Sequence, residues 1–365
     1  MLHPDQKQYN IVGIMSGTSL DGLDIAYSEF TYLNEKWKFN IPYAETIPYD
    51  FHWKNKLKHA HKENLEHFLE LDRSYGTFIG QQIQFFCKKY NLNPDYISSH
   101  GHTIFHQPEK KLTCQLGHGA SIYAVTDIPT IADFRVTDMA LGGHGAPLVP
   151  IGDELLFGEY EYCLNIGGIA NISHSIQNKR TAFDICPANF ILNYLAQQIN
   201  KEYDKNGELA KSGTLNQKML NELNAIAYYK LPSPKSLGRE YIERHFLPII
   251  DSYTIPIHDK LHTYCHHIIF QIAEIVNKLS QQKNKIYSVL MTGGGVWNTF
   301  LWNELAPQYL RSNIPLFIPD NSIVDFKEAL VFAFLGVLRV RDEINCLRSV
   351  TGASIDCCGG VIFGV

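Results

Sequence analysis

Residues 12–27 read Val-Gly-Ile-Met-Ser-Gly-Thr-Ser-Leu-Asp-Gly-Leu-Asp-Ile-Ala-Tyr, two apolar runs on either side of a polar turn that contains glycine. Glycine lets backbone N–H groups turn toward an anion, and the hydroxyls of Thr18 and Ser19 add donors. A carboxylate such as Asp21 suits the metal ion that accompanies a nucleotide. No lysine follows the turn, and the residues after it alternate as in a strand, which excludes a Walker A loop. The stretch predicts a phosphate-binding hairpin.

Length and composition are those of a soluble enzyme with two domains. The chain has 365 residues, of which 45% are hydrophobic and 19% charged. The formal charge of −5 and the scattered basic residues argue against a nucleic-acid partner, and no apolar run is long enough to cross a membrane. The polar N-terminus lacks the apolar core of a signal peptide, and the eight cysteines form no CxxC pair. We therefore expect a cytoplasmic protein with free thiols.

Strand and helix patterns alternate along the chain, which indicates an α/β fold with mixed sheets. Strands are expected at 9–15, 23–30, 96–98, 130–132, 162–166, 171–173, 287–291 and 315–318. Helices are expected at 51–59, 67–90, 188–199, 215–229, 261–279, 299–305 and 327–340. We place a first lobe in residues 1–150 and a second lobe in 151–345, and we leave 346–365 unassigned.

Residues 164–173, Leu-Asn-Ile-Gly-Gly-Ile-Ala-Asn-Ile-Ser, repeat the pattern of strand, glycine turn and strand. Two such hairpins, one in each half, predict two similar lobes that present phosphate-binding turns to a shared cleft. A third glycine turn, 293–295, follows a predicted strand and precedes a helix. Its backbone admits a phosphate or a flat ring, and a tight strand-to-helix turn is the alternative interpretation.

Asp184 follows an apolar run that Pro187 ends. A carboxylate at the end of a strand facing a cleft is placed to act as a general base. The alternative is a cap for the helix that follows. We favour the base because glycine turns suited to phosphate accompany it.

Arg135 lies in the segment Asp133-Phe-Arg135, ahead of a glycine-rich loop. Its planar guanidinium suits a carboxylate or a phosphate. A surface ion pair with Asp133 or Asp138 is an equally strong alternative.

Residues 100–106 form the richest histidine cluster, with His100, His102 and His106. A metal site would need a further ligand at a defined spacing, and the sequence nearby offers only His118. We therefore expect His100 and Thr103 to make polar contacts with a substrate.

Taken together and in their order along the chain, these motifs resemble those of the anhydro-N-acetylmuramic acid kinase family, part of the sugar kinase/actin/Hsp70 superfamily. The matching segments cover nearly the whole chain and are 15–24, 133–135, 142–150, 165–171, 183–184, 234–239 and 293–295. The resemblance implies two lobes with related, ribonuclease H-like mixed-sheet cores around an ATP cleft.

The resemblance also implies a reaction. Such kinases use MgATP to open the 1,6-anhydro ring of 1,6-anhydro-N-acetylmuramic acid with water and to phosphorylate O6, giving N-acetylmuramic acid 6-phosphate in peptidoglycan recycling. Asp184 resembles the base that activates the water, and Arg135 and Glu328 align with sugar contacts. The expected partner is this small anhydrosugar, and we expect neither a nucleic acid nor a membrane as a partner. The sequence leaves open whether the chain forms a homodimer.

The hairpins and the third glycine turn are then the places where ATP and Mg²⁺ bind. Asp21 is the metal-side acid, acting through water. The predicted cofactor contacts are Gly17, Thr18, Ser19, Asp21, Gly22, Asp24, Asn165, Gly167, Gly168, Gly293, Gly294 and Gly295.

The chain departs from the common family pattern at four positions. Cys186 and Ala188 replace two glycines near Asp184, and His102 and His144 replace glutamines. Two other classes of function compete with the kinase: a non-catalytic ATP-driven clamp of the actin or Hsp70 type, and a glycoside hydrolase that uses no phosphate. The hydrolase fails to explain three glycine turns.

Overall fold

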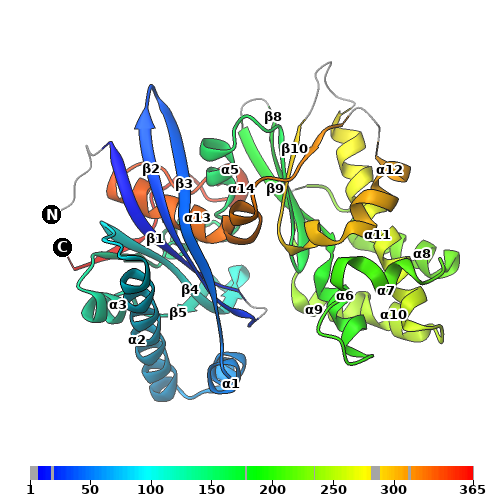
Figure 1. The fold of residues 1–365 in the computed structure, drawn as a ribbon, viewed down its shortest axis with the longest axis horizontal. Helices are drawn as coiled ribbons and strands as arrows, with labels where there is room; N and C mark the ends of the chain where they lie inside the picture. The colour runs from blue at the N-terminus through cyan, green and yellow to red at the C-terminus, as the bar shows by residue number, and fades with distance from the viewer. Residues whose placement is uncertain are drawn as a thin grey trace. The chain divides into compact units, whose positions relative to one another are not determined.

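The structure is a computed structural model that describes residues 7–17, 20–176, 179–233, 235–280, 288–310 and 314–364. The chain divides into two units (Figure 1). The first unit consists of Met1–Gly158 and Phe326–Val365, and the second of Glu159–Asp325. Each unit is built around one mixed β-sheet.

The sheet of the first unit has the order β12-β6-β4-β1-β2-β3, with β5 paired to β4. β1, β2 and β3 form an antiparallel meander, β1 and β6 run parallel to β4, and β5 and β12 are antiparallel to their neighbours. The strands are β1 (Gln8–Ser16), β2 (Gly22–Leu33), β3 (Lys36–Pro48), β4 (Tyr96–Gln107), β5 (Leu112–Leu116), β6 (Thr130–Ala132) and β12 (Val361–Phe363).

The sheet of the second unit has the order β11-β10-β7-β8-β9. β7, β8 and β9 are antiparallel, whereas β10 runs parallel to both β7 and β11. These orders and directions equal those of β6-β4-β1-β2-β3, which confirms the predicted pair of related ribonuclease H-like cores. The strands are β7 (Tyr162–Ile166), β8 (Ile169–Ile176), β9 (Lys179–Pro187), β10 (Val289–Thr292) and β11 (Leu316–Phe317).

Helices connect the strands in both units. The first unit holds α1 (Phe51–His59), α2 (Leu65–Tyr90), α3 (Gly119–Thr126), α4 (Val136–Ala140), α5 (Pro150–Leu156) and α14 (Arg348–Thr351). The second holds α6 (Asn189–Gln197), α7 (Glu208–Lys211), α8 (Gln217–Asn224), α9 (Arg239–His245), α10 (Leu247–Ser252), α11 (Ile257–Ser280) and α12 (Ala306–Tyr309). Helix α13 (Asn321–Val340) continues from the second unit into the first, with non-helical backbone at Phe326.

Shorter helical turns complete the chain. They are 3₁₀ turns at Ala60–Lys62, Pro108–Lys110, Lys205–Gly207, Ala227–Lys230 and Gly294–Trp297, and a π turn at Phe300–Leu305. None of the helices in the described ranges combines the length and apolarity needed to cross a bilayer.

Helix α2 covers one face of the first sheet because its apolar residues recur at helical spacing. Leu71, Tyr75, Ile79, Ile83 and Phe86 are buried in one cluster with alternate residues of the first two strands. The Asn64 side chain accepts the His67 N–H at the start of the helix, and Asn91 ends it in the left-handed conformation.

Helix α13 packs very closely on β1 and β4. A Cβ atom at Gly13 would overlap the carbonyl oxygen of Ala329 and lie 2.9 Å from the Ala333 methyl group. The Ser98 hydroxyl donates a 2.5 Å hydrogen bond to the Phe332 carbonyl. Glycine at position 13 therefore lets the helix approach the sheet.

The sequence missed several elements, chiefly β3, β5, β12, α3 and α5. β4 continues to Gln107 instead of ending at residue 98, so the histidine-rich segment lies largely on a strand. The expected helix at 215–229 ends at Asn224 and is followed by a 3₁₀ turn. Residue 287 of the expected strand at 287–291 lies outside the described residues.

The predicted lobe boundaries were wrong at the C-terminal side. Residues 326–345, expected in the second lobe, belong to the first unit, and so do 346–365. The reason is the apolar composition of α13, whose residues 329–335 are all buried. A helix that is apolar on all sides must be covered on all sides.

We expect Gly13→Ala to lower the free energy of unfolding by about 1–3 kcal/mol, because the methyl group forces α13 away from the sheet. Urea unfolding measures this loss. Gly168→Ala is the matched control, because no atom lies within 4 Å of the added methyl group. Equal stability of the two variants would contradict the close packing of α13.

Candidate functional site

A pocket of about 320 Å³ in the first unit brings together several predicted site residues. It is lined by Met15, Ser16, Gly17, His100, Thr103, His106, Arg135, Ala146 and Glu328. They come from the end of β1, from β4, from the turn before α4, from the glycine-rich loop and from α13. The predicted sugar contacts Arg135, Glu328, His100 and Thr103 therefore share one cavity.

Arg135 is fixed by hydrogen bonds to neutral groups. Its Nε and Nη2 lie 3.1 and 2.8 Å from His100 Nε2, and Nη1 donates to the Gly145 carbonyl at 2.6 Å. Burial lowers the pKa of Arg135 to about 10, which leaves it charged at neutral pH. The alternative of a surface ion pair with Asp133 or Asp138 was wrong, since these bonds hold the guanidinium at the pocket.

His100 is a neutral acceptor for Arg135. Its Nδ1 lies 3.0 Å from the Gly101 carbonyl, so Nδ1 carries the proton and Nε2 presents a lone pair to the guanidinium. Burial and the charge of Arg135 hold the pKa of His100 well below its ordinary value. The ring also packs on Phe332, with the centroids 4.5 Å apart.

Glu328 is the acid of the pocket. Burial raises the pKa of its carboxyl group, while Arg135 and Lys327 act in the opposite direction. Lys327 itself makes a buried 2.6 Å ion pair with Asp153. The pocket thus presents a fixed cation and an acid to a polar ligand.

A buried hydrogen-bond chain lies behind Ser16 at the end of β1. The Ser16 hydroxyl lies 2.8 Å from His102 Nδ1 and 2.7 Å from the Tyr49 hydroxyl, which in turn lies 2.5 Å from the Tyr75 hydroxyl. Burial lowers the pKa of His102 to about 4, so the ring is neutral. His102, one of the departures from the family pattern, thus supports the first hairpin by its hydrogen bond to Ser16.

The turn of the first hairpin is described in part. Thr18 and Ser19 lie outside the described residues, and Asp21 is exposed beside them. The Asp24 carboxylate accepts a 2.6 Å hydrogen bond from the Thr46 hydroxyl of β3. A Cβ atom at Gly22 would lie 2.6 Å from the Ile47 carbonyl oxygen, so close strand packing explains this glycine.

Asp184 lies within β9 and not at its end, because the strand continues to Pro187. Its Oδ2 accepts the Leu237 N–H at 2.8 Å, and its backbone carbonyl accepts the Tyr228 hydroxyl at 2.6 Å. Burial raises the pKa of Asp184 to about 6, and the bond from Leu237 opposes this rise. The helix-cap alternative was wrong, since α6 begins after Ala188 with no side-chain cap.

The other predicted residues of the second unit form two adjoining glycine turns. Gly293, with a φ of 84°, and Gly295 pack directly against Asn165 and Ile166 of β7. Gly168 has no atom within 4 Å of a Cβ position, and Gly167 and Gly294 have only distant ones. The packed glycines join the turns, whereas the open ones leave a cradle of bare backbone.

The remaining departures from the family pattern occupy different environments. Cys186 and Ala188 are fully buried in the core of the second unit, and the Ala188 N–H donates to the Gly168 carbonyl. His144 is exposed, and its backbone N–H donates to the Thr351 carbonyl at 2.9 Å. Through this hydrogen bond Ala188 supports the glycine turn at Gly168.

Sequence reasoning missed the residues that hold the site from outside it. Tyr49 and Tyr75 support Ser16, Leu237 and Tyr228 hold Asp184, and Asp138 anchors the glycine-rich loop by accepting the Gly145 N–H at 2.7 Å. These pairs are formed by segments distant in sequence, so local patterns carry no signal for most of them.

Two units with the same sheet topology, each with a glycine hairpin, define the class of the chain: an α/β protein with two related ribonuclease H-like cores. Residues 9–365 match the family model described as anhydro-N-acetylmuramic acid kinase. The chain belongs to this family and is therefore a kinase, which implies the use of ATP.

Two curated relatives agree with this assignment. The chain is 32% identical over 377 residues to the anhydro-N-acetylmuramic acid kinase of Hydrogenovibrio crunogenus, with 100% of both chains covered. It is 34% identical to that of Photobacterium profundum, covering 94% of this chain and 95% of the relative. A solved structure, (R)-2-hydroxyglutaryl-CoA dehydratase component A of Acidaminococcus fermentans, superposes with a TM-score of 0.44 and 11% identity over 91% of this chain and 99% of that one.

His102→Gln should reduce the acid sensitivity of the fold. The pKa of His102 falls from 6.5 in the unfolded chain to about 4, so the unfolded chain binds the extra proton and stability falls as the pH drops from 6.5 toward 4. Between pH 7 and pH 5 we expect the variant to lose about 1–2 kcal/mol less than the parent in urea unfolding. Exposed His61→Gln is the control, and equal losses in all three proteins would refute a neutral buried His102.

Gly168→Ala should raise the Kd for ATP about tenfold without changing the thermal unfolding temperature, because its methyl group enters the open cradle. Gly295→Ala should instead lower stability, because its methyl group meets the Ile166 side chain. Titration calorimetry and thermal unfolding distinguish these effects. Unchanged ATP binding by Gly168→Ala would show that phosphate lies elsewhere.

Proposed function

We propose that this kinase opens the 1,6-anhydro ring of 1,6-anhydro-N-acetylmuramic acid with water and phosphorylates O6 from ATP. The product is N-acetylmuramic acid 6-phosphate, and the role is peptidoglycan recycling in the cytoplasm. Membership of the family supports the substrate. Eight free thiols are in keeping with a reducing compartment.

The environment of the Asp184 carboxylate is the observation that carries the proposal. A general base works best with a pKa near the operating pH, and burial raises the pKa of Asp184 to about 6. The Leu237 N–H holds Oδ2, and among the described residues no other group donates to the carboxylate. Oδ1 is thus available to water.

The proposed reaction joins hydrolysis of the anhydro bond to phosphoryl transfer. Asp184 takes a proton from water while the water oxygen bonds to C1, and the bond between C1 and O6 breaks. O6 then bonds to the γ-phosphorus of ATP, and ADP leaves. Placing both events on one substrate makes O6 the leaving group of the first step and the nucleophile of the second.

The pocket of the first unit suits the amino sugar. Arg135 has five N–H donors, of which His100 and Gly145 engage three, so two stay available for a ligand. A guanidinium fork matches the lactyl carboxylate of a muramic acid, and Glu328 offers acceptors to hydroxyl groups. Thr103 lines the same cavity.

ATP and Mg²⁺ fit the remaining predicted residues. The open backbone at Gly167, Gly168 and Gly294 suits phosphate, because N–H groups without side chains can approach an anion. Exposed Asp21 is the residue assigned to Mg²⁺ through water. The ion supplies charge neutralisation during phosphoryl transfer.

The decisive experiment is mass spectrometry of the product formed from the anhydrosugar, MgATP and ¹⁸O-labelled water. We expect one phosphate and one heavy oxygen at C1. A product without phosphate would indicate a hydrolase, and ATP binding without any sugar product would indicate a nucleotide-driven clamp. Either result would overturn the proposed reaction.

Asp184→Asn should lower kcat by about 10²–10⁴ while leaving the Kd for ATP nearly unchanged, since the amide oxygen still accepts the Leu237 N–H. Asp251→Asn, which removes an exposed carboxylate that accepts from Tyr194, is the control and should keep full activity. Full turnover by Asp184→Asn would exclude Asp184 as the base.

The pH profile gives a separate test of the same base. Because the pKa of Asp184 is raised to about 6, its carboxylate is protonated below that pH and kcat/KM should fall about tenfold per pH unit there. Steady-state assays between pH 5 and 8 measure this limb, and a profile flat down to pH 5 would contradict the assignment.

A further inference from the structure

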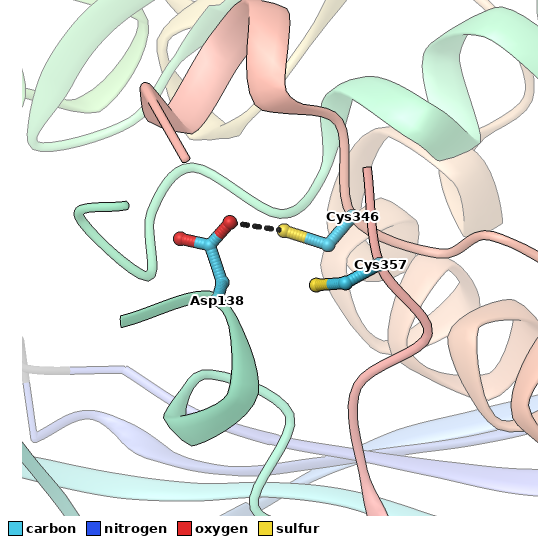
Figure 2. A group of neighbouring side chains, drawn as sticks. All are labelled: Asp138, Cys346 and Cys357. Atoms are coloured by element: carbon cyan, nitrogen blue, oxygen red, sulfur yellow. Dashed lines mark hydrogen bonds between the residues drawn. The ribbon is translucent and has the colours of Figure 1, made fainter. Parts of the chain in front are cut away.

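Three potential metal ligands meet in the first unit, outside the pocket. One oxygen of Asp138 and the sulfur atoms of Cys346 and Cys357 all lie within 4.8 Å of one another (Figure 2). Asp138 comes from α4, and the two cysteines face each other across an antiparallel bridge near the C-terminus. The side chains point toward a common centre.

This cluster is deeply buried. The exposed fractions are 0% for Asp138, 2% for Cys346 and 8% for Cys357. In the described part of the chain, no basic side chain pairs with the Asp138 carboxylate, which is held by N–H, O–H and S–H dipoles instead. A buried carboxylate beside two thiols is a favourable environment for a cation.

The carboxylate is already oriented without help from the cysteines. Thr351 donates to Oδ1 at 2.6 Å, and the Gly145 N–H donates to Oδ2 at 2.7 Å. Such outer hydrogen bonds are what fixes a ligating carboxylate in metal sites. Cys346 approaches Oδ1 to 3.2 Å, and anchoring of the glycine-rich loop does not require its sulfur.

We infer that Asp138, Cys346 and Cys357 form a binding site for a thiophilic divalent ion, with Zn²⁺ as the best match. Tetrahedral Zn²⁺ with Zn–S distances of about 2.3 Å and Zn–O distances of about 2.0 Å holds its ligand atoms roughly 3.5–3.8 Å apart. Cys346 Sγ lies 3.2 Å from Asp138 Oδ1, slightly below this range, and all three ligand atoms lie within 4.8 Å of one another, so a small outward shift would admit the ion. A water molecule would fill the fourth position.

Binding replaces two thiol protons by the ion and releases them to solvent, with no change in oxidation state. The ion would join three segments of the first unit, namely α4 and the strands of the C-terminal bridge. Through Asp138 and Gly145 it would also brace the carbonyl that accepts from Arg135. Its role is structural, and the proposed sugar reaction does not depend on it.

The test uses the full chain, purified under reducing conditions, incubated with Zn²⁺ and desalted. Native mass spectrometry should find one ion per chain in the parent and in Cys358→Ser, which removes the neighbouring thiol. Cys346→Ser and Cys357→Ser should lose the ion. Serine at 346 still donates to Asp138, so its apo form should unfold at the same temperature as the apo parent.

Two further readouts separate a site from adventitious binding. Co²⁺ should give a thiolate charge-transfer band in the near ultraviolet with the parent and with Cys358→Ser, but not with the other two variants. Zn²⁺ should raise the unfolding temperature of the parent and of Cys358→Ser, which retain the ion, but not that of Cys346→Ser or Cys357→Ser. Metal content that is unaffected by both substitutions, or a Cys346–Cys357 disulfide in the freshly reduced protein, would overturn the inference.

Discussion

The close packing of α13 on β1 is the contact on which the first unit depends. Because Gly13 has no side chain, α13 lies directly on the sheet. The chain returns from the second unit to the first along this helix. That position brings Glu328 into the pocket and Phe332 against the His100 ring. His100 in turn receives Arg135, so a packing constraint in the core fixes a charged group in the site.

Desolvation then gives each polar residue its chemical state. His100 and His102 stay neutral because they are buried. His100 accepts from the Arg135 guanidinium and donates to the Gly101 carbonyl, and His102 shares a hydrogen bond with the Ser16 hydroxyl. The same effect raises the pKa of Asp184 toward neutrality. Burial thus keeps His100 an uncharged acceptor for Arg135, and it gives Asp184 the raised pKa that the proposed role as a general base calls for.

Local patterns predicted the parts of the fold that are stabilised locally. The two glycine hairpins and α1 were predictable, because alternation, helical spacing and turn residues lie within a few positions of each other. The edge strand β3 was not, since half-exposed polar residues interrupt its apolar pattern. Arg135 and Glu328 were named from motif and family resemblance, whereas Tyr49, Tyr75 and Leu237 became visible only when distant segments were folded together.

The fixed charges of the first pocket have a consequence for inhibitor design. Arg135 favours the binding of one anionic group. Glu328, an acid in the same cavity, disfavours a second anion and favours hydroxyl or amide donors. Neutral His100 offers no further positive charge, because its lone pair is already committed to Arg135. Compounds with a single acid on a neutral, donor-rich ring should therefore be more selective than phosphate-rich nucleotide mimics.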